Sequence, residues 1–330
     1  MADTPELISK QMLDRYPLPF VQENYPDLFD AVKRDNLIVF IGAGVSKLLG
    51  CSLWDELAVK LAKKICTYGE ADVLEKEAIV SPRKVISICY GRCNEDSEKL
   101  QIYKKTIEEE LAIVDKEKAK SLYNKIFELD PKAYITTNID LGIIDALPEA
   151  KRVEIYDCTR PEDLAKIEIA DFNVLRDGNI IFLHGTIKNI EEIIFPVEKY
   201  LKHYRDDHKI IIGLLKTIFK EGNVILFIGY SLTEWEIIEK IYRLTGEGNK
   251  EKKIKTSYLL TPLYSHEYTK YVLDKDYYTL FNVEIIPYFI DYDGYGKLEV
   301  IIENLAKAVD KHKPSPLEIL GEIEDVAKYA

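Results

Sequence analysis

The chain carries short runs of apolar residues, separated by longer segments in which apolar positions recur every three or four residues. Residues 37–41 form the first run, which has no polar interruption and is too short to span a membrane. Such a run is typical of a strand buried on both faces of a parallel sheet. We expect further strands at residues 133–136, 153–156, 179–183, 223–228, 256–260 and 283–289.

Helical periodicity occupies the segments between these runs. Because strands alternate with helices, the pattern predicts an α/β fold with a doubly wound, mostly parallel, Rossmann-like sheet. Pro287 lies inside the last run and lacks a backbone donor, so we expect that strand at an edge of the sheet or with a bulge. Helices are predicted at residues 27–32, 52–68, 82–93, 98–114, 116–129, 197–204, 209–220, 234–244, 266–273 and 298–312.

A long segment without a strand pattern separates the first two predicted strands. We therefore expect a Rossmann-like domain over residues 36–312 with a helical insertion at about 60–130, which forms a small subdomain or a cover over the ligand crevice. Residues 1–35 are expected to pack on this core as a lead-in. The tail, residues 313–330, has helical spacing and is expected to pack on its own chain; docking to a partner subunit is the alternative.

The charge balance narrows the possible partners. The chain has 45 basic and 57 acidic residues and a net charge of -12, which opposes binding to nucleic acid or to an anionic membrane. The N-terminus lacks the features of a signal peptide, so we expect a cytoplasmic protein. Five cysteines without a Cys-x-x-Cys pair predict neither a disulfide framework nor a structural zinc site, and we expect no metal.

A glycine turn directly follows the first predicted strand. Gly42 and Gly44 allow a sharp turn and the close approach of a ligand, and Ser46 adds a hydroxyl group. A strand, a glycine turn and a helix in this order place free backbone N–H groups where a dinucleotide phosphate can bind. The third glycine of the usual fingerprint is missing, so a plain turn remains an alternative at this point.

Polar residues also follow three other predicted strands, at the edge of the sheet where open α/β folds bind ligands. Each has a structural alternative. Asn138 and Asp140 can form a turn and cap a helix, and His184 can be a core histidine. Gly229 and Ser231 can form a simple strand-to-helix turn. The convergence of four strand ends on one edge of the sheet favours a ligand site over four separate coincidences.

Four segments, residues 42–46, 136–140, 183–185 and 229–232, occur in an order and spacing that resemble the sirtuin-like NAD-binding domain. The segments 53–57 and 291–292 look like those of a bacterial branch whose members act as NAD-consuming effectors in anti-phage defence. The resemblance implies a role for each matching position: Gly42, Ala43, Gly44 and Ser46 around the pyrophosphate, Asn138 at the nicotinamide ribose and its attacking water, Asp140 at the carboxamide, His184 at the ribose hydroxyls as base, and Gly229, Ser231 and Leu232 along the adenosine.

Two departures from the family pattern favour one of its activities. Sirtuin deacylases follow the glycine turn with a Pro-Asp-Phe-Arg segment and carry a four-cysteine zinc module, and this chain has neither. We therefore expect NAD to be the substrate of a hydrolysis that releases nicotinamide and ADP-ribose. The alternatives are a non-catalytic sensor of NAD or of an ADP-ribose derivative, an NAD-dependent protein deacylase and an ADP-ribosyltransferase. Such an effector is expected to be activated by a separate trigger-sensing partner or by assembly into a homo-oligomer.

Overall fold

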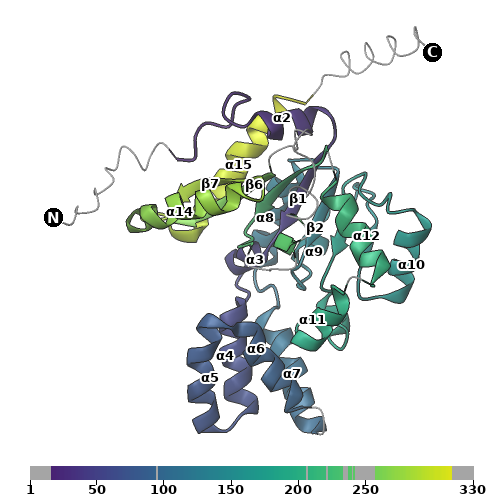
Figure 1. Cartoon of the computed structure of the whole chain (residues 1–330), viewed down its shortest axis with the longest axis vertical. Helices are drawn as coiled ribbons and strands as arrows, with labels where there is room; N and C mark the ends of the chain where they lie inside the picture. Colours follow the sequence, from purple (N-terminus) through teal and green to yellow (C-terminus); the bar gives the residue numbers. More distant parts are fainter. Residues whose placement is uncertain are drawn as a thin grey trace, which may run out of the picture.

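A computed structural model describes residues 16–93, 96–205, 207–220, 222–232, 237–239, 241 and 257–313 (Figure 1). Within these ranges, seven strands form one parallel sheet in the order β3-β4-β2-β1-β5-β6-β7. The predicted α/β class and doubly wound sheet are confirmed. The strands are β1 (Leu37–Ile41), β2 (Ala133–Thr136), β3 (Ile155–Asp157), β4 (Asn179–Phe182), β5 (Val224–Ile228), β6 (Ser257–Leu263) and β7 (Val283–Phe289).

Helices cover both faces of the sheet, which explains why its central strands are apolar without interruption. One face packs against α2, α8, α9 and α15, and the other packs against α10, α11, α12 and α14. The helices are α2 (Pro26–Lys33), α3 (Ala43–Leu48), α4 (Trp54–Ile65), α5 (Tyr68–Val80), α6 (Pro82–Gly91), α7 (Ser97–Glu110), α8 (Lys116–Phe127), α9 (Gly142–Asp145), α10 (Pro161–Ile169), α11 (Val197–His203), α12 (Lys209–Ile218), α14 (Tyr268–Thr279) and α15 (Lys297–Asp310), with 3-10 turns η1 (Ile187–Asn189), η2 (Ser265–Glu267) and η3 (Gly294–Gly296).

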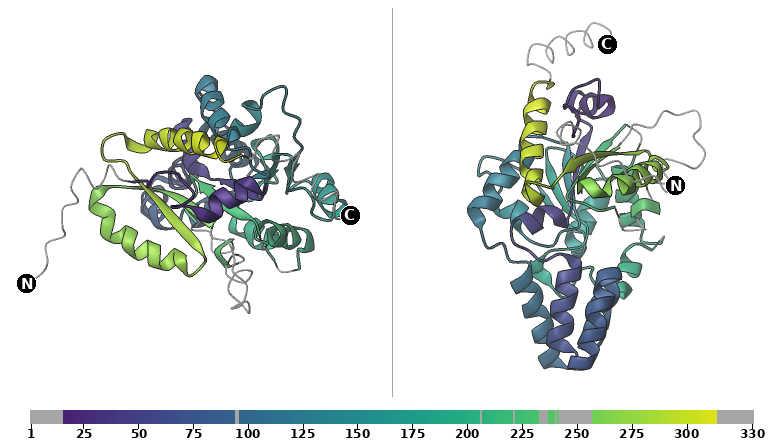
Figure 2. Two further views of the ribbon diagram at one scale, coloured as in Figure 1. Left: turned by 90° about the horizontal axis from the view of Figure 1, so that it is seen from above. Right: turned by 90° about the vertical axis from the view of Figure 1, so that its left-hand side faces the viewer.

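Helices α4 to α7 form a separate bundle that projects from the end of the sheet where β1 leads into α3 (Figures 1 and 2). The bundle has its own apolar core, to which α4, α6 and α7 contribute most of the buried side chains. Helices α4 to α8 thus lie between β1 and β2 in the chain. The sheet and the bundle meet at the carboxyl ends of the strands, which is the edge where ligands bind in folds of this class.

Four helices, α3, α5, α9 and α10, lie outside the helices predicted from the sequence. In α5 only Ala71 and Ala78 are buried, while Val73, Ile79 and Val80 are exposed, so no apolar stripe marks the helix. Helix α10 follows a short third strand, which begins two residues later than predicted. The last strand, β7, lies at an edge of the sheet, as Pro287 predicted. The segments 1–15 and 314–330 and most of the predicted helix at 234–244 lie outside the described residues.

Candidate functional site

The glycine turn after β1 packs directly against the end of β5. The N–H of Gly42 donates to the carbonyl of Ile228 at 2.9 Å, and the N–H of Gly44 donates to the carbonyl of Gly229 at 2.8 Å. The sequence pattern predicted free N–H groups in this turn for a phosphate, but those of Gly42 and Gly44 are not free. They are already bonded because β1 and β5 are neighbouring strands whose ends stay in contact beyond the sheet.

The same contact explains why both positions are glycine. A Cβ atom at Gly42 would lie 2.5 Å from the carbonyl oxygen of Gly229 and 2.5 Å from the Cα atom of Tyr230. A Cβ atom at Gly44 would lie 2.9 Å from the same carbonyl oxygen. Gly229 has a φ of 63°, which glycine adopts with little strain. These glycines therefore let two strand ends touch, which is a structural function apart from any ligand.

Asn138 lies just beyond β2 and is held in place by its amide group. Its Nδ2 donates to the carbonyl oxygen of Gly42 and to Oγ of Ser46, each at 2.9 Å. The carbonyl oxygen of Gly42 can only accept, so the NH₂ group must face it, and the orientation of the amide is fixed. Among the described residues, no donor is bonded to Oδ1 of Asn138. This oxygen is the acceptor that the network leaves for a ligand.

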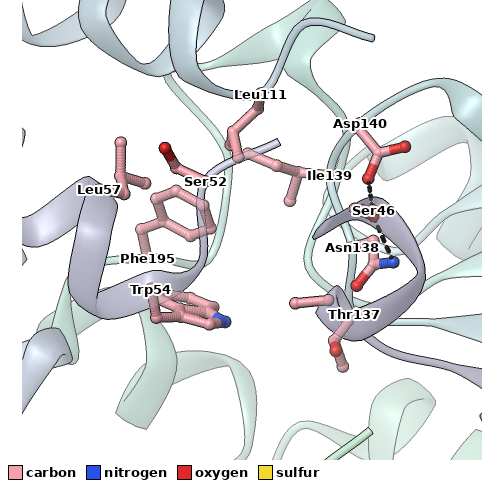
Figure 3. Close-up of a pocket in the computed structure, with 11 residues that line it drawn as sticks. Ser46, Ser52, Trp54, Leu57, Leu111, Thr137, Asn138, Ile139, Asp140 and Phe195 are labelled. Carbon is pink, nitrogen blue, oxygen red and sulfur yellow. Dashed lines mark hydrogen bonds between the residues drawn. The ribbon is translucent and has the colours of Figure 1, made fainter. Parts of the chain in front are cut away.

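Asp140 belongs to the same hydrogen-bond network. Its Oδ2 accepts from Oγ of Ser46 at 2.5 Å, and its Oδ1 accepts from the N–H of Gly142 at 2.9 Å, where α9 begins. Burial raises the pKa of Asp140, although these two hydrogen bonds oppose the shift. Ser46 thus donates to Asp140 and accepts from Asn138 (Figure 3). The hydroxyl that was predicted to lie at the pyrophosphate is used to connect these two side chains.

Two adjoining cavities open between the sheet and the helical bundle. The smaller has a volume of about 30 Å³ and is lined by Asn138, Asp140 and apolar side chains, among them Trp54 and Phe195 (Figure 3). That volume holds one or two water molecules. The larger has a volume of about 640 Å³, which is in the range of small-molecule sites. Both are lined by Ala43, Trp54 and Thr137, so the small cavity adjoins the large one beside Asn138.

His184 follows β4 and lies outside both cavities. Its ring is fully buried, is hydrogen-bonded through Nε2 to Oη of Tyr204 at 2.9 Å, and packs edge-on against Tyr200 with centroids 5.6 Å apart. Burial, together with the nearby His203 and Arg83, holds the pKa of His184 well below its usual value, so the imidazole is neutral. The structure therefore places Asn138 and His184 in separate environments.

The remaining predicted residues divide between the cavities and the core. Ala43, Gly44, Gly229 and Ser231 line the large cavity. Leu232 does not line it, because its side chain is buried in the core on the second face of the sheet. The structure brings together the glycine turn, the end of β2 and the end of β5, and it leaves His184 and Leu232 apart from them.

Several residues that line the cavities were not predicted as site residues from the sequence. Trp54 lines both cavities, and its ring lies 4.5 Å from that of Phe195. Arg83 lines the large cavity from the start of α6. The sequence predicted a helix that begins at residue 82, and a cover over the ligand crevice was one of two arrangements expected for the insertion, but nothing in the pattern singled out Arg83. The helical bundle contributes these residues, and its position depends on tertiary packing.

Part of the chain is similar to known proteins. Residues 132–280 match the SIR2-like domain family. The NAD(+) hydrolase ThsA of Cytobacillus dafuensis is 23% identical to this chain over 234 residues, which are 68% of this chain and 42% of the relative. The chain thus spans less than half of that relative's length.

The SIR2-like match confirms the resemblance drawn from the four strand-end segments. It includes Asn138, His184 and Gly229, whereas the glycine turn precedes the matched residues. In the described ranges, no group of three or more histidine, cysteine or acidic side chains is arranged to hold a metal ion. No described helix has the length and apolar character needed to cross a membrane.

Proposed function

We propose that this protein hydrolyses NAD at the bond between nicotinamide and ribose and releases nicotinamide and ADP-ribose. The observation that carries the proposal is the fixed side chain of Asn138, whose Oδ1 is left without a donor beside a cavity of the size of a water molecule. The adjoining cavity of about 640 Å³ has room for the rest of a dinucleotide. The SIR2-like domain and the similarity to an NAD(+) hydrolase support the same reaction.

The chemistry needs little acid catalysis. The nicotinamide ring nitrogen of NAD is cationic, so the glycosidic C–N bond breaks with its electron pair moving to nitrogen and nicotinamide leaves as a neutral molecule. Positive charge develops on the ribose, as in other glycosidic cleavages. A water molecule that donates a hydrogen bond to Oδ1 of Asn138 adds its oxygen to the ribose carbon and loses one proton. The products are nicotinamide, ADP-ribose and a proton.

His184 can act in this reaction only if the side chains around it rearrange. The family resemblance implies that His184 acts as a base at the ribose hydroxyls, and its neutral imidazole is in the correct form to accept a proton. In this structure Tyr200 and Tyr204 enclose the ring. We propose that His184 reaches the substrate only after these tyrosines move. The structure then corresponds to a resting state of the enzyme, which fits a protein that needs activation.

The biological role and the activation are part of the same proposal. Unregulated loss of NAD harms a cell, so we propose an effector of bacterial anti-phage defence that is activated by a separate trigger-sensing partner or by homo-oligomer assembly. The similarity to an NAD(+) hydrolase supports the activity, and the enclosed His184 supports the need for a trigger. Direct binding of nucleic acid is not part of the proposal, because the net charge of the chain is -12.

A non-catalytic sensor of NAD or of an ADP-ribose derivative is the second candidate. The enclosed position of His184 favours it, because a binding protein does not need a base. A deacylase is disfavoured, since the chain lacks the zinc module and the Pro-Asp-Phe-Arg segment of that branch.

Release of nicotinamide from NAD by the purified chain, measured beside NAD binding, separates these functions. We expect release, which increases when the activating partner or the assembled form is present. Binding without release under every activating condition contradicts the hydrolase and leaves the sensor. Absence of binding contradicts both functions.

A further inference from the structure

The glycine turn does not have enough free donors to bind the charged pyrophosphate of the proposed substrate, NAD. The pyrophosphate of NAD carries two negative charges, and such groups are held in proteins by free N–H groups or by cations. The N–H groups of Gly42 and Gly44 already donate to carbonyls at the end of β5. In the turn, the N–H of Ala43 remains without an acceptor among the described residues. One neutral donor is a weak match for two charges, so a cation is required elsewhere in the cavity.

Arg83 is the cation among the residues that line the two cavities. It is the second residue of α6, and it lines the large cavity together with residues of the glycine turn and of the end of β5. The charge of opposite sign in this lining comes from Asp55 of α4. No ion pair joins Asp55 or any other described carboxylate to Arg83. No described carboxylate therefore competes with a ligand for the guanidinium.

The guanidinium is also held in place. Its Cζ atom lies 3.7 Å from the ring centroid of Tyr200, which is the geometry of a cation–π contact. Its Nε is buried and donates to no acceptor in the described part of the chain. Stacking on an aromatic face fixes the plane of the group but uses none of its donors. The other cations of α6 and its surroundings differ in this respect: Lys84 pairs with Glu77 at 2.7 Å, and Arg92 pairs with Glu70 at 2.7 Å.

We propose that Arg83 binds the pyrophosphate of NAD, so that the helical bundle supplies the positive charge and the sheet supplies Asn138. This inference rests on the proposed function for the identity of the dinucleotide, and it adds a specificity residue that the SIR2-like segment, residues 132–280, does not contain. The bundle then has a role beyond covering the crevice. A bound substrate then contacts both the bundle and the sheet, and its charged contact with Arg83 holds the two parts together.

The proposal also connects the substrate to His184. Arg83 stacks on Tyr200, and Tyr200 packs edge-on against His184. A phosphate that reorients the guanidinium removes the partner that holds the Tyr200 ring. Binding of the pyrophosphate therefore favours the displacement of Tyr200 that His184 needs to reach the ribose.

Binding of ADP-ribose, compared with adenosine, tests the proposal on the full-length chain. ADP-ribose contains the pyrophosphate but no nicotinamide, so its affinity is measured by calorimetry without turnover. We expect Arg83→Ala to weaken ADP-ribose by roughly tenfold to hundredfold, as for the loss of hydrogen bonds to a charged group. Affinity for adenosine should not change. Lys84→Ala is the matched control, because it removes one exposed charge from the neighbouring position of the same helix.

The outcomes separate this proposal from the hydrolase. Selective weakening of ADP-ribose supports the role of Arg83 whether or not the wild-type chain cleaves NAD. Unchanged affinity in Arg83→Ala overturns it, even if the chain releases nicotinamide. Equal weakening of ADP-ribose and adenosine also overturns it, because the side chain then only shapes the cavity through Tyr200. Absence of ADP-ribose binding to the wild-type chain overturns it as well. Arg83→Lys should recover part of the affinity, since it restores the charge without the planar fork.

Discussion

Two polar corners at the same edge of the sheet differ in what surrounds them. The Asn138 corner, formed by Asn138, Ser46 and Asp140, adjoins the cavities, and its hydrogen bonds leave one acceptor for a ligand. The His184 corner, formed by His184, Tyr200 and Tyr204, is closed by aromatic rings. The first corner lines a cavity, whereas His184 of the second corner lines neither cavity.

The strand register does not predict this difference. Thr136 of β2 pairs with Phe182 of β4, so Asn138 and His184 each lie two residues beyond paired positions. Register places both residues at the same edge of the sheet, but the loop that follows each strand sets the direction of the side chain. Gly185, directly after His184, has a φ of 83°, which redirects the chain there. Two residues at the same edge of the sheet therefore lie at the same end of the fold, but this position alone does not show that they belong to one site.

Removal of the Asn138 side chain should have the largest effect. Asn138→Ala takes away the acceptor for the attacking water, and we expect nicotinamide release to fall by about 10²–10⁴-fold. The rate of nicotinamide release, measured beside the far-ultraviolet circular dichroism spectrum, checks this. Asn173→Ala, at an exposed turn after α10, is the control and should retain the wild-type rate. A wild-type rate in Asn138→Ala would show that the open corner is not the reacting site.

His184→Gln and Tyr204→Phe together test the closed corner. If His184 is the base, His184→Gln loses about 10²–10⁴-fold in rate, whereas Tyr204→Phe removes only its hydrogen-bond partner and keeps turnover. Each variant should lose about 1 kcal/mol of unfolding free energy through the broken hydrogen bond. Rates and urea unfolding are measured on both. Full activity in His184→Gln would make this residue a core histidine, the structural alternative that its burial suggests.

The sequence predicted the sheet far better than it predicted the site. Mostly apolar runs identified every described strand, and the runs of β1 and β5 are uninterrupted because these strands are buried on both faces. The same reasoning placed Asn138 at the correct edge of the sheet. It did not reveal that Ser46 connects Asn138 to Asp140, or that Tyr200 encloses His184, because both arrangements depend on tertiary packing. Helix α5 was missed because its apolar residues face outward.

Gly42→Ala should damage the Asn138 corner through packing. The new Cβ atom would lie 2.5 Å from backbone atoms of Gly229 and Tyr230, which have little freedom to move. We expect a loss of about 1–3 kcal/mol in unfolding free energy, as for other overpacked positions. Displacement of the Gly42 carbonyl should also release the Asn138 amide and lower nicotinamide release. Urea unfolding and turnover are measured on the same preparation.

Gly69→Ala is the matched control for that packing argument. Gly69 lies in the first turn of α5, and no atom lies within 4 Å of the position that a Cβ would take. Alanine in a helix is favoured over glycine by about 0.5–1 kcal/mol, so this variant should be slightly more stable than the wild-type chain. Equal stability changes at Gly42 and Gly69 would contradict the proposed contact between the strand ends.

The last prediction concerns pH, and it distinguishes the two corners by sign. Burial lowers the pKa of His184, and it lowers that of His203 beside it to about 3. Above pH 6.5 both residues are neutral in the folded and unfolded states. Below it the unfolded state binds more protons, so each histidine removes about 1.4 kcal/mol of stability per pH unit as the pH falls. Asp140 has a raised pKa, so the folded state binds the extra proton, and its contribution to stability increases as the pH falls from that raised pKa to 3.8.

Comparing the pH dependence of stability of each variant with that of the wild-type chain separates these two opposite contributions. Asp35 and Glu284 also have pKa values raised by burial, and their contributions cancel when a variant is compared with the wild-type chain. His203→Gln should lose less stability than the wild-type chain between pH 6.5 and 5, and Asp140→Asn should lose more as the pH approaches 4. Urea unfolding at each pH measures both. Parallel pH profiles for His203→Gln and the wild-type chain would mean that His203 is charged in the folded state, and the aromatic enclosure of the His184 corner would then have to admit water or a counter-charge.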